Sequence, residues 1–86
     1  MKLYFHKKFE KQYKRLRKNE QQRVQERIIL FRENRFHPIL ENHPLQGKYV
    51  GHHSINIGGD LRALFKQVGA DEYWFVKIGT HSELYE

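Results

Sequence analysis

The second half of the chain consists of short strand-like runs, two with a period of two residues and a third that is densely apolar, separated by glycine-containing turns. The runs span residues 54–57, 61–66 and 73–78, and the turns fall at Gly58-Gly59 and at residues 69–72. A period of two residues is the period of a strand, and short turns of this composition join antiparallel neighbours. The pattern therefore predicts a three-stranded antiparallel meander. A sheet of this kind is stable only if another layer covers its apolar face.

Residues 1–36 place their apolar side chains at helical spacing instead. One helix is predicted over residues 7–17 and a second over residues 20–33, the latter begun by a capping box of Asn19 and Gln22. The apolar stripes consist of Phe9, Tyr13 and Leu16 on the first helix and of Val24, Ile28 and Phe31 on the second. Because both stripes are one-sided, we expect the helices to form a hairpin that covers a sheet.

The remaining segments complete the order β-α-α-β-β-β. Leu3-Tyr4-Phe5 is long enough for one strand, and residues 34–45 form an irregular connector with two prolines and a short turn of helix near Ile39. A chain of 86 residues supports one hydrophobic core, so residues 1–86 are expected to be a single domain. We predict an α+β fold in which the helical hairpin packs on one face of a small antiparallel sheet. The other face is then less covered and available to a ligand.

Positive charge is concentrated in the first part of the chain. Residues 1–36 hold 12 Lys and Arg against 4 Asp and Glu, whereas residues 37–86 hold 4 against 6. This asymmetry suggests a polyanion or an acidic protein as partner, and a solvated basic helix face explains it equally well.

Several classes of protein are excluded by what the sequence lacks. Without cysteine there is neither a disulfide framework nor a thiolate nucleophile or metal ligand. No window has the apolar length of a signal peptide core or a membrane span, so we expect a soluble, cytoplasmic protein with no membrane partner. Six histidines are present, but His52 and His53 are adjacent and would point to opposite faces of a strand. No metal and no other cofactor is expected.

Five polar residues stand where the ends of the predicted meander can meet. His43 precedes its first strand, Asp60 and Arg62 begin the second, and His81 and Tyr85 follow the third. Each hairpin returns the chain by one strand length, so these positions can share a site. Taken singly, His43, Asp60 and His81 are explained at least as well by turns or caps, whereas Arg62 must project from a defined face of its strand.

Together these residue types suit the cleavage of an RNA phosphodiester. That reaction needs a base for the 2′-OH proton, an acid for the departing 5′ oxygen and a cation for the phosphoryl oxygens. Histidine titrates near neutrality and arginine matches phosphate geometry, so His43, His81, Asp60 and Arg62 supply the required types. Tyr85 can stack on a base or donate a hydrogen bond.

Three segments resemble the signature segments of the YafQ-like mRNA interferases of the RelE/ParE superfamily. They are His43-Pro44-Leu45-Gln46-Gly47, Gly59-Asp60-Leu61-Arg62 and Gly79-Thr80-His81-Ser82-Glu83-Leu84-Tyr85. The resemblance extends from about Leu3 to Tyr85. It implies a toxin of a type II toxin–antitoxin pair, an endoribonuclease that cleaves mRNA in the A site of the 70S ribosome and that a cognate antitoxin silences. The residues that it implies as catalytic are His43, Asp60, His81 and Tyr85, with Arg62 at a position where many RelE-type members have a strand arginine.

One position departs from the YafQ pattern. Asn56 stands where that pattern has a second histidine, before the turn. Asparagine cannot exchange a proton near neutral pH, although it can donate a hydrogen bond to phosphate. Phosphate contacts to RNA are expected from this residue and from the basic residues Lys7, Lys8, Lys11, Lys14, Arg15 and Lys48.

Two other functions are compatible with the same fold, because a fold does not determine a function. One is a ParE-like toxin that inhibits DNA gyrase, against which His81 and Tyr85 argue. The other is a non-catalytic member that retains only antitoxin binding, which Asn56 suggests.

Overall fold

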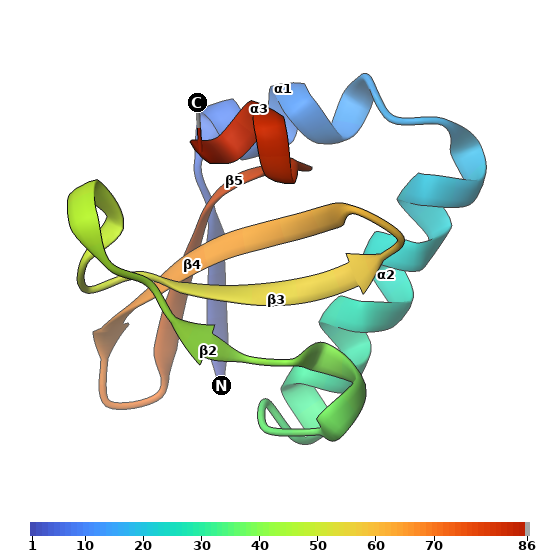
Figure 1. Ribbon diagram of the computed structural model, residues 1–86. Helices are drawn as coiled ribbons and strands as arrows, with labels where there is room; N and C mark the ends of the chain where they lie inside the picture. Colours follow the sequence, from blue (N-terminus) through green and yellow to red (C-terminus); the bar gives the residue numbers. More distant parts are fainter. Residues whose placement is uncertain (86) are drawn as a thin grey trace.

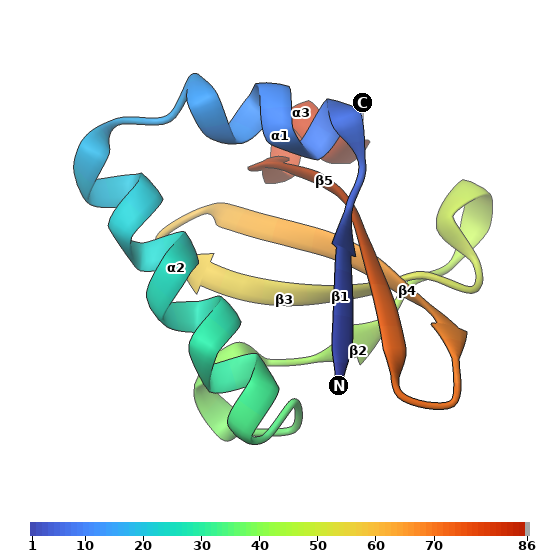
Figure 2. The ribbon, with the colours of Figure 1, turned by 180° about the vertical axis from the view of Figure 1, so that it is seen from behind.

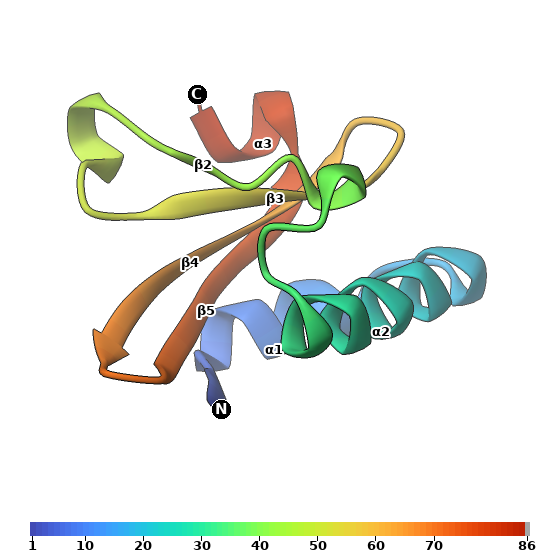
Figure 3. The ribbon, with the colours of Figure 1, turned by 90° about the horizontal axis from the view of Figure 1, so that it is seen from below.

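The computed structural model describes residues 1–85, which form three α-helices and a five-stranded mixed sheet (Figure 1). In chain order the elements are β1 (Lys2–Phe5), α1 (Lys7–Lys14), α2 (Lys18–Glu33), the 3-10 helix η1 (Pro38–Leu40), β2 (His43–Pro44), the 3-10 helix η2 (Gly47–Tyr49), β3 (His53–Gly58), β4 (Leu61–Gly69), β5 (Glu72–Thr80) and α3 (His81–Tyr85). The strands lie in the order β1-β5-β4-β3-β2. Helices α1 and α2 lie on one side of the sheet and α3 on the other (Figure 3). The predicted α+β fold is confirmed.

The core lies between α2 and the meander, and Phe31 is at its centre. This side chain is fully buried, and its ring meets those of Phe65, Tyr73 and Phe75 edge-on at centroid distances of 5.0, 5.3 and 5.2 Å. Edge-to-face contacts of this kind stabilise a core beyond the area that they bury. Of the predicted stripes, Phe9, Val24 and Phe31 are buried, and the other three residues are partly buried against them.

The sheet is mixed, so the prediction that it is antiparallel is wrong for one pair of strands. β1 pairs in parallel with β5, with Leu3 opposite Tyr73 and Phe5 opposite Phe75. The meander leaves the outer edge of β5 with backbone groups that need partners, although its side chains are in the core. β1 satisfies that edge over four residues, and the two strands run side by side in Figure 2.

The helix boundaries differ from the predicted ones. α1 ends at Lys14, and α2 begins at Lys18 because the carboxylate of Glu20 accepts a hydrogen bond from the Arg17 backbone N–H at 3.0 Å. The predicted box of Asn19 and Gln22 is therefore wrong, and the Asn19 side chain accepts only from the N–H of the next residue, at 3.0 Å. The predicted turn of helix near Ile39 is confirmed as η1.

Three elements were not predicted. β2 and η2 interrupt the stretch before the meander, whose first strand begins only at His53. α3 follows β5 directly and is begun by a reciprocal cap: Thr80 N–H donates to Glu83 Oε1 at 2.7 Å, and Glu83 N–H donates to Thr80 Oγ1 at 3.3 Å. This cap turns the chain back over the sheet face that the helical hairpin leaves uncovered.

Candidate active site

A pocket of about 280 Å³ lies on the α3 side of the sheet and is lined by five residues: His43, Leu45, Arg62, His81 and Tyr85. Four of them are residues that the sequence predicts as catalytic. They come from β2, β4 and α3, which are distant in sequence. The pocket is where we expected the less covered face of the sheet to hold a ligand.

Strand register explains why these side chains share a face. His43 pairs with Ser54, and Asn56 two residues later pairs with Arg62. Directly paired residues project to the same side of a sheet, as do residues two apart on one strand. Ser54, Asn56 and Arg62 therefore lie on the side opposite to the core, where His43 can join them.

The imidazole of His43 has a defined orientation. Its Nδ1 lies 2.8 Å from the backbone oxygen of Glu41, a residue in the left-handed conformation with φ of 46°. A carbonyl oxygen only accepts, so this contact requires a proton on Nδ1. In the neutral ring Nε2 is then left with its lone pair, which is the form that accepts a proton.

Arg62 is anchored by one nitrogen. Its Nε donates to the hydroxyl of Ser54 at 2.8 Å, and that serine is fully buried. A buried hydroxyl needs a partner, so the contact satisfies Ser54 and fixes the plane of the guanidinium. The two terminal nitrogens of Arg62 are then presented as a planar pair of the kind that binds phosphate oxygens.

His81 and Tyr85 lie one turn apart on α3. Their ring centroids are 4.7 Å apart, and the ring of Tyr85 also meets that of Tyr49 edge-on at 5.7 Å. The hydroxyl of Tyr49 donates to the backbone oxygen of Leu84 at 2.8 Å. Helix α3 is thus held at its start by its cap and near its end by Tyr49.

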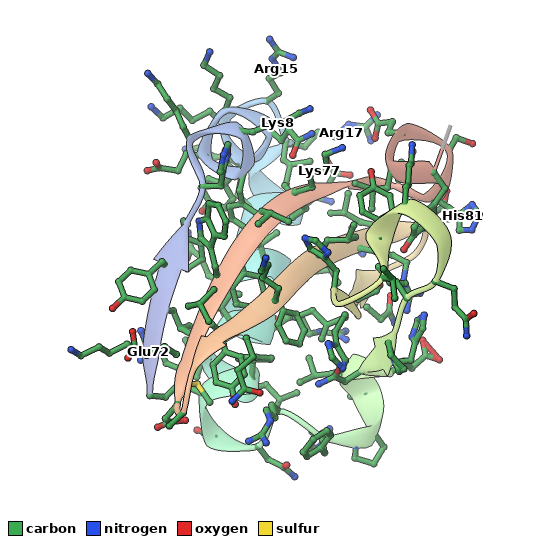
Figure 4. All side chains as sticks on the ribbon, turned by 90° about the vertical axis from the view of Figure 1, so that its left-hand side faces the viewer. Lys8, Arg15, Arg17, Glu72, Lys77 and His81 are labelled. Carbon is green, nitrogen blue, oxygen red and sulfur yellow. The ribbon has the colours of Figure 1, made fainter. Side chains whose placement is uncertain are left out.

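Lys77 is a cation of this region that the sequence analysis missed. It projects from β5 and donates to the hydroxyl of Tyr49 at 2.9 Å, with its ammonium 5.2 Å from the centre of that ring. In Figure 4 it lies between the cations of α1 and His81. No motif in the sequence marks Lys77. Its pairing with Leu64 across the sheet is the feature that assigns it to the pocket side.

Two of the predicted residues are not part of the pocket lining. Asp60 is exposed in the turn between β3 and β4, next to Gly59 with φ of 56°. The amide oxygen of Asn56 accepts from the backbone N–H of Gly58 at 3.1 Å, where the register of β3 and β4 shifts. Asn56 thus stabilises the irregular end of β3.

The predicted RNA-binding cations divide into three places. Four of them line a hollow of about 420 Å³ together with His6 and Gln12, namely Lys7, Lys8, Lys11 and Arg15. Lys14 lies instead on a separate, apolar groove of about 620 Å³ between α1, α2 and β1. Lys48 lies beside the active-site region, with its ammonium 5.3 Å from the centre of the Tyr49 ring.

Within residues 1–85, no three His, Asp or Glu side chains converge in a way that would hold a metal ion. In the same part of the chain, none of the helices combines the length and the apolar character of a membrane span.

Comparisons with known proteins place the chain in a family. A family model described as the bacterial toxin YafQ of a type II toxin–antitoxin system matches residues 1–86. The fold matches YafQ from E. coli strain BL21(DE3) with a TM-score of 0.83 at 19% identity, over 98% of this chain and 97% of that one. E. coli YafQ in its complex with DinJ gives 0.79 at 20% identity, over 98% and 96%. A YoeB/ParE toxin from Agrobacterium tumefaciens gives 0.79 at 19%, over 94% and 99%. A comparison with curated proteins gave no match.

Proposed function

The chain belongs to the YafQ family of toxins of bacterial type II toxin–antitoxin systems, and from this premise we propose that it is an endoribonuclease that cleaves mRNA in the ribosomal A site. The observation that carries the proposal is the convergence of His43, Arg62, His81 and Tyr85 on one pocket. These side chains provide two imidazoles that can accept or donate a proton, a phosphate-binding cation and an aromatic ring. RNA cleavage by acid and base catalysis requires these groups and no metal ion.

We assign the role of base to His43. Its Nδ1 proton is committed to the Glu41 carbonyl, so Nε2 accepts the proton of the 2′-OH. The 2′ oxygen then attacks the adjacent phosphorus, forming a 2′,3′-cyclic phosphate. His81, in its protonated form, gives its proton to the 5′ oxygen as the bond from phosphorus to that oxygen breaks. The net reaction transfers one proton from the 2′-OH to the leaving 5′ oxygen.

Arg62 is proposed to bind the phosphoryl oxygens, on which negative charge increases in the transition state. Its anchor on Ser54 means that little of its side-chain freedom is lost at that moment. Tyr85 is proposed to hold a base by stacking, with the apolar side chain of Leu45 on the pocket wall. Asp60 enters the proposed site through its place in the family signature. From its turn it would contact RNA outside the pocket.

The hydrogen bond that Asn56 makes weakens the argument for a non-catalytic toxin, which the replacement of histidine at this position had suggested. The Asn56 side chain is hydrogen-bonded within the β3–β4 hairpin, so its position has a structural use that is independent of proton transfer. A non-catalytic toxin that only binds antitoxin is therefore the second candidate, and it is distinguished by the absence of cleavage. A ParE-like inhibitor of gyrase is the third, distinguished by DNA damage without mRNA cleavage.

We also propose that a cognate antitoxin silences this toxin, as a complex with DinJ has been solved for E. coli YafQ. The basic face of α1 and the apolar groove beside it together favour a partner segment that is both acidic and apolar. A small antitoxin with an acidic tail, encoded in the neighbouring reading frame, fits this description. Its coexpression should restore growth to cells that express the toxin.

Cleavage of mRNA on programmed 70S ribosomes by the purified protein tests the main proposal. We expect cleavage by the wild type and a loss of about 100-fold or more in His81→Asn, as removal of a general acid causes. His37→Asn is the matched control, because His37 lies outside the pocket and serves as an N-cap, a position that asparagine also fills. Intact mRNA with wild-type protein, or an equal loss in both variants, would contradict the proposal.

A further inference from the structure

A second cluster of aromatic and cationic side chains lies on the open face of the sheet, away from the catalytic pocket. Trp74 of β5 pairs with Tyr4 of β1 on one side and with Lys66 of β4 on the other, so the three side chains share a face. The ring of His6 packs against Trp74 at a centroid distance of 5.2 Å. No step of the proposed reaction uses these residues.

A bulge in β5 places this cluster on the same face as Lys77. Leu64 pairs with Lys77 and Phe65 pairs with Phe75, so the register shifts by one residue between them. Without the shift, Trp74 and Lys77 would project to opposite sides, because they are three residues apart. With it, both lie on the open face, and Lys77 connects through Tyr49 to Tyr85 of the pocket.

His6 joins Trp74 to the basic hollow on α1. Its Nδ1 accepts from the Lys8 backbone N–H at 2.9 Å, and its ring lines the hollow with Lys7, Lys8, Lys11 and Arg15. Gln12, at the same hollow, accepts from the backbone N–H of Ile78 at 2.8 Å and fixes α1 against β5. An aromatic face and a hollow lined by cations are thus held together by one side chain.

Negative charge marks where this surface ends. Asp71 pairs with the N-terminal ammonium at 2.8 Å, and Glu72 accepts from the Tyr4 hydroxyl at 3.0 Å. Both acidic residues lie beyond Trp74, toward the β4–β5 turn. In Figure 4 Glu72 is far from Lys8, Arg15, Lys77 and His81, which lie along the opposite end of the sheet. A polyanion on this face would therefore run from the pocket toward α1 and stop at Trp74.

We propose that this cluster is a second subsite for single-stranded RNA, with a base stacked on Trp74 and a backbone phosphate in the hollow lined by Lys7, Lys8, Lys11 and Arg15. Single-strand binding sites combine these two features, a positive groove along the backbone and aromatic rings under the bases. Trp74 and Gly79, beside the pocket, pair with Lys66 and Arg62, which are four residues apart on β4, or about 13 Å at 3.3 Å per residue. That distance corresponds to about four nucleotides at their stacked spacing. The inference rests on the proposed function, because that function places one part of the bound RNA in the catalytic pocket.

Trp74 is the single tryptophan of the chain, so its fluorescence reports on this subsite directly. The probe is a 2′-O-methyl octanucleotide, which lacks the 2′-OH and cannot be cleaved. We expect it to quench the fluorescence of the full-length protein at low salt and to bind more tightly than a trinucleotide. In an assay with a labelled octanucleotide, Trp74→Ala should weaken binding about tenfold and Trp74→Phe much less, since phenylalanine retains a stacking face. Thermal unfolding of both variants identifies any loss of folding.

A pair of double variants separates the hollow from the overall charge. Lys8→Gln with Lys11→Gln removes two cations of the hollow, and Lys18→Gln with Arg32→Gln removes two cations of α2 that lie outside it. We expect the first to weaken octanucleotide binding about tenfold and to reduce the slope of log affinity against log salt by about 1.4, at about 0.7 per phosphate contact. The second should have a much smaller effect.

Several outcomes would overturn the subsite. They are the absence of octanucleotide binding at low salt, binding without a change in Trp74 fluorescence, equal losses in the two double variants, and equally tight binding of duplex RNA. Cleavage on ribosomes is measured separately. Quenching without cleavage would retain the subsite and reject the proposed nuclease, whereas cleavage without quenching would do the reverse.

Discussion

The two faces of the sheet are built from the same strands and have opposite properties. The face under α1 and α2 consists of fully or nearly fully buried side chains, namely Ile55, Ile57, Ala63, Phe65, Phe75 and Ile78. The face toward α3 includes Ser54, Asn56, Arg62 and Lys77, each of which makes a polar contact: Arg62 with Ser54, Asn56 with the Gly58 backbone and Lys77 with Tyr49. Because successive side chains of a strand point to opposite faces, one residue packs in the core and the next faces the candidate site. Neighbours in sequence should therefore have separable effects when they are substituted.

The largest effect is expected on the covered face. Phe31→Ala removes a fully buried ring that meets three aromatic rings of the sheet. Removal of a buried phenylalanine typically costs about 3–5 kcal/mol, a large part of the stability of a domain of this size. Urea unfolding should show a much lower midpoint or no folded state. A midpoint within about 1 kcal/mol of the wild type would mean that the core is not organised around Phe31.

An intermediate effect is expected for Ser54, the buried residue that holds Arg62 on the open face. Ser54→Ala removes the acceptor of the Arg62 Nε hydrogen bond, so the guanidinium loses its fixed orientation. We expect cleavage to fall about tenfold, which corresponds to about 1.4 kcal/mol of transition-state stabilisation, with a small change in stability. Cleavage on programmed ribosomes and urea unfolding measure the two effects.

The neighbouring residue supplies the control for Ser54. Ile55 is also fully buried but faces the helices. Ile55→Ala should destabilise the fold by about 2–5 kcal/mol while the folded fraction keeps its cleavage rate. If Ser54→Ala and Ile55→Ala both act only on stability, the division of roles between the two faces is wrong.

The periodicity of the sequence predicted the covered face of the sheet. It did not predict the parallel pairing of β1 with that sheet or the helix α3 that follows β5. The helical stripe of Phe31 and the alternation of β3, β4 and β5 are local patterns, so the helices and the meander could be predicted. The parallel pairing of β1 with β5 joins residues about 70 positions apart and has no local signal. The start of α3 did have one, since Thr80 and Glu83 stand at capping-box spacing, but the helix is too short to show a periodicity.

On the open face, the sequence predicted only those site residues that lie at the ends of strands. His43, Arg62, His81 and Tyr85 line one pocket because they lie at the ends of paired strands. Asp60 shares that position in sequence, but the left-handed glycine before it belongs to an exposed turn outside the pocket. Lys77 was missed because the bulge in β5 changes which residues face the pocket side, and a bulge cannot be read from alternation alone.

The smallest effect is expected at the edge of the open face, where Tyr4 donates to Glu72. The hydrogen bond to that carboxylate, aided by partial burial and by its negative charge, raises the pKa of the Tyr4 hydroxyl above its ordinary value of about 10. A raised pKa means that the folded state favours the protonated phenol. The contact should therefore stabilise the protein below pH 10 and lose this effect as the pH rises through the raised pKa. Tyr4→Phe should lower the Tm slightly at pH 8, and the difference from the wild type should vanish or reverse above that pKa. Glu72→Gln should reduce the dependence on pH, because the amide oxygen can still accept the hydrogen bond but carries no negative charge. A Tm difference that stays constant from pH 8 to above the raised pKa would show that Tyr4 contributes by packing alone.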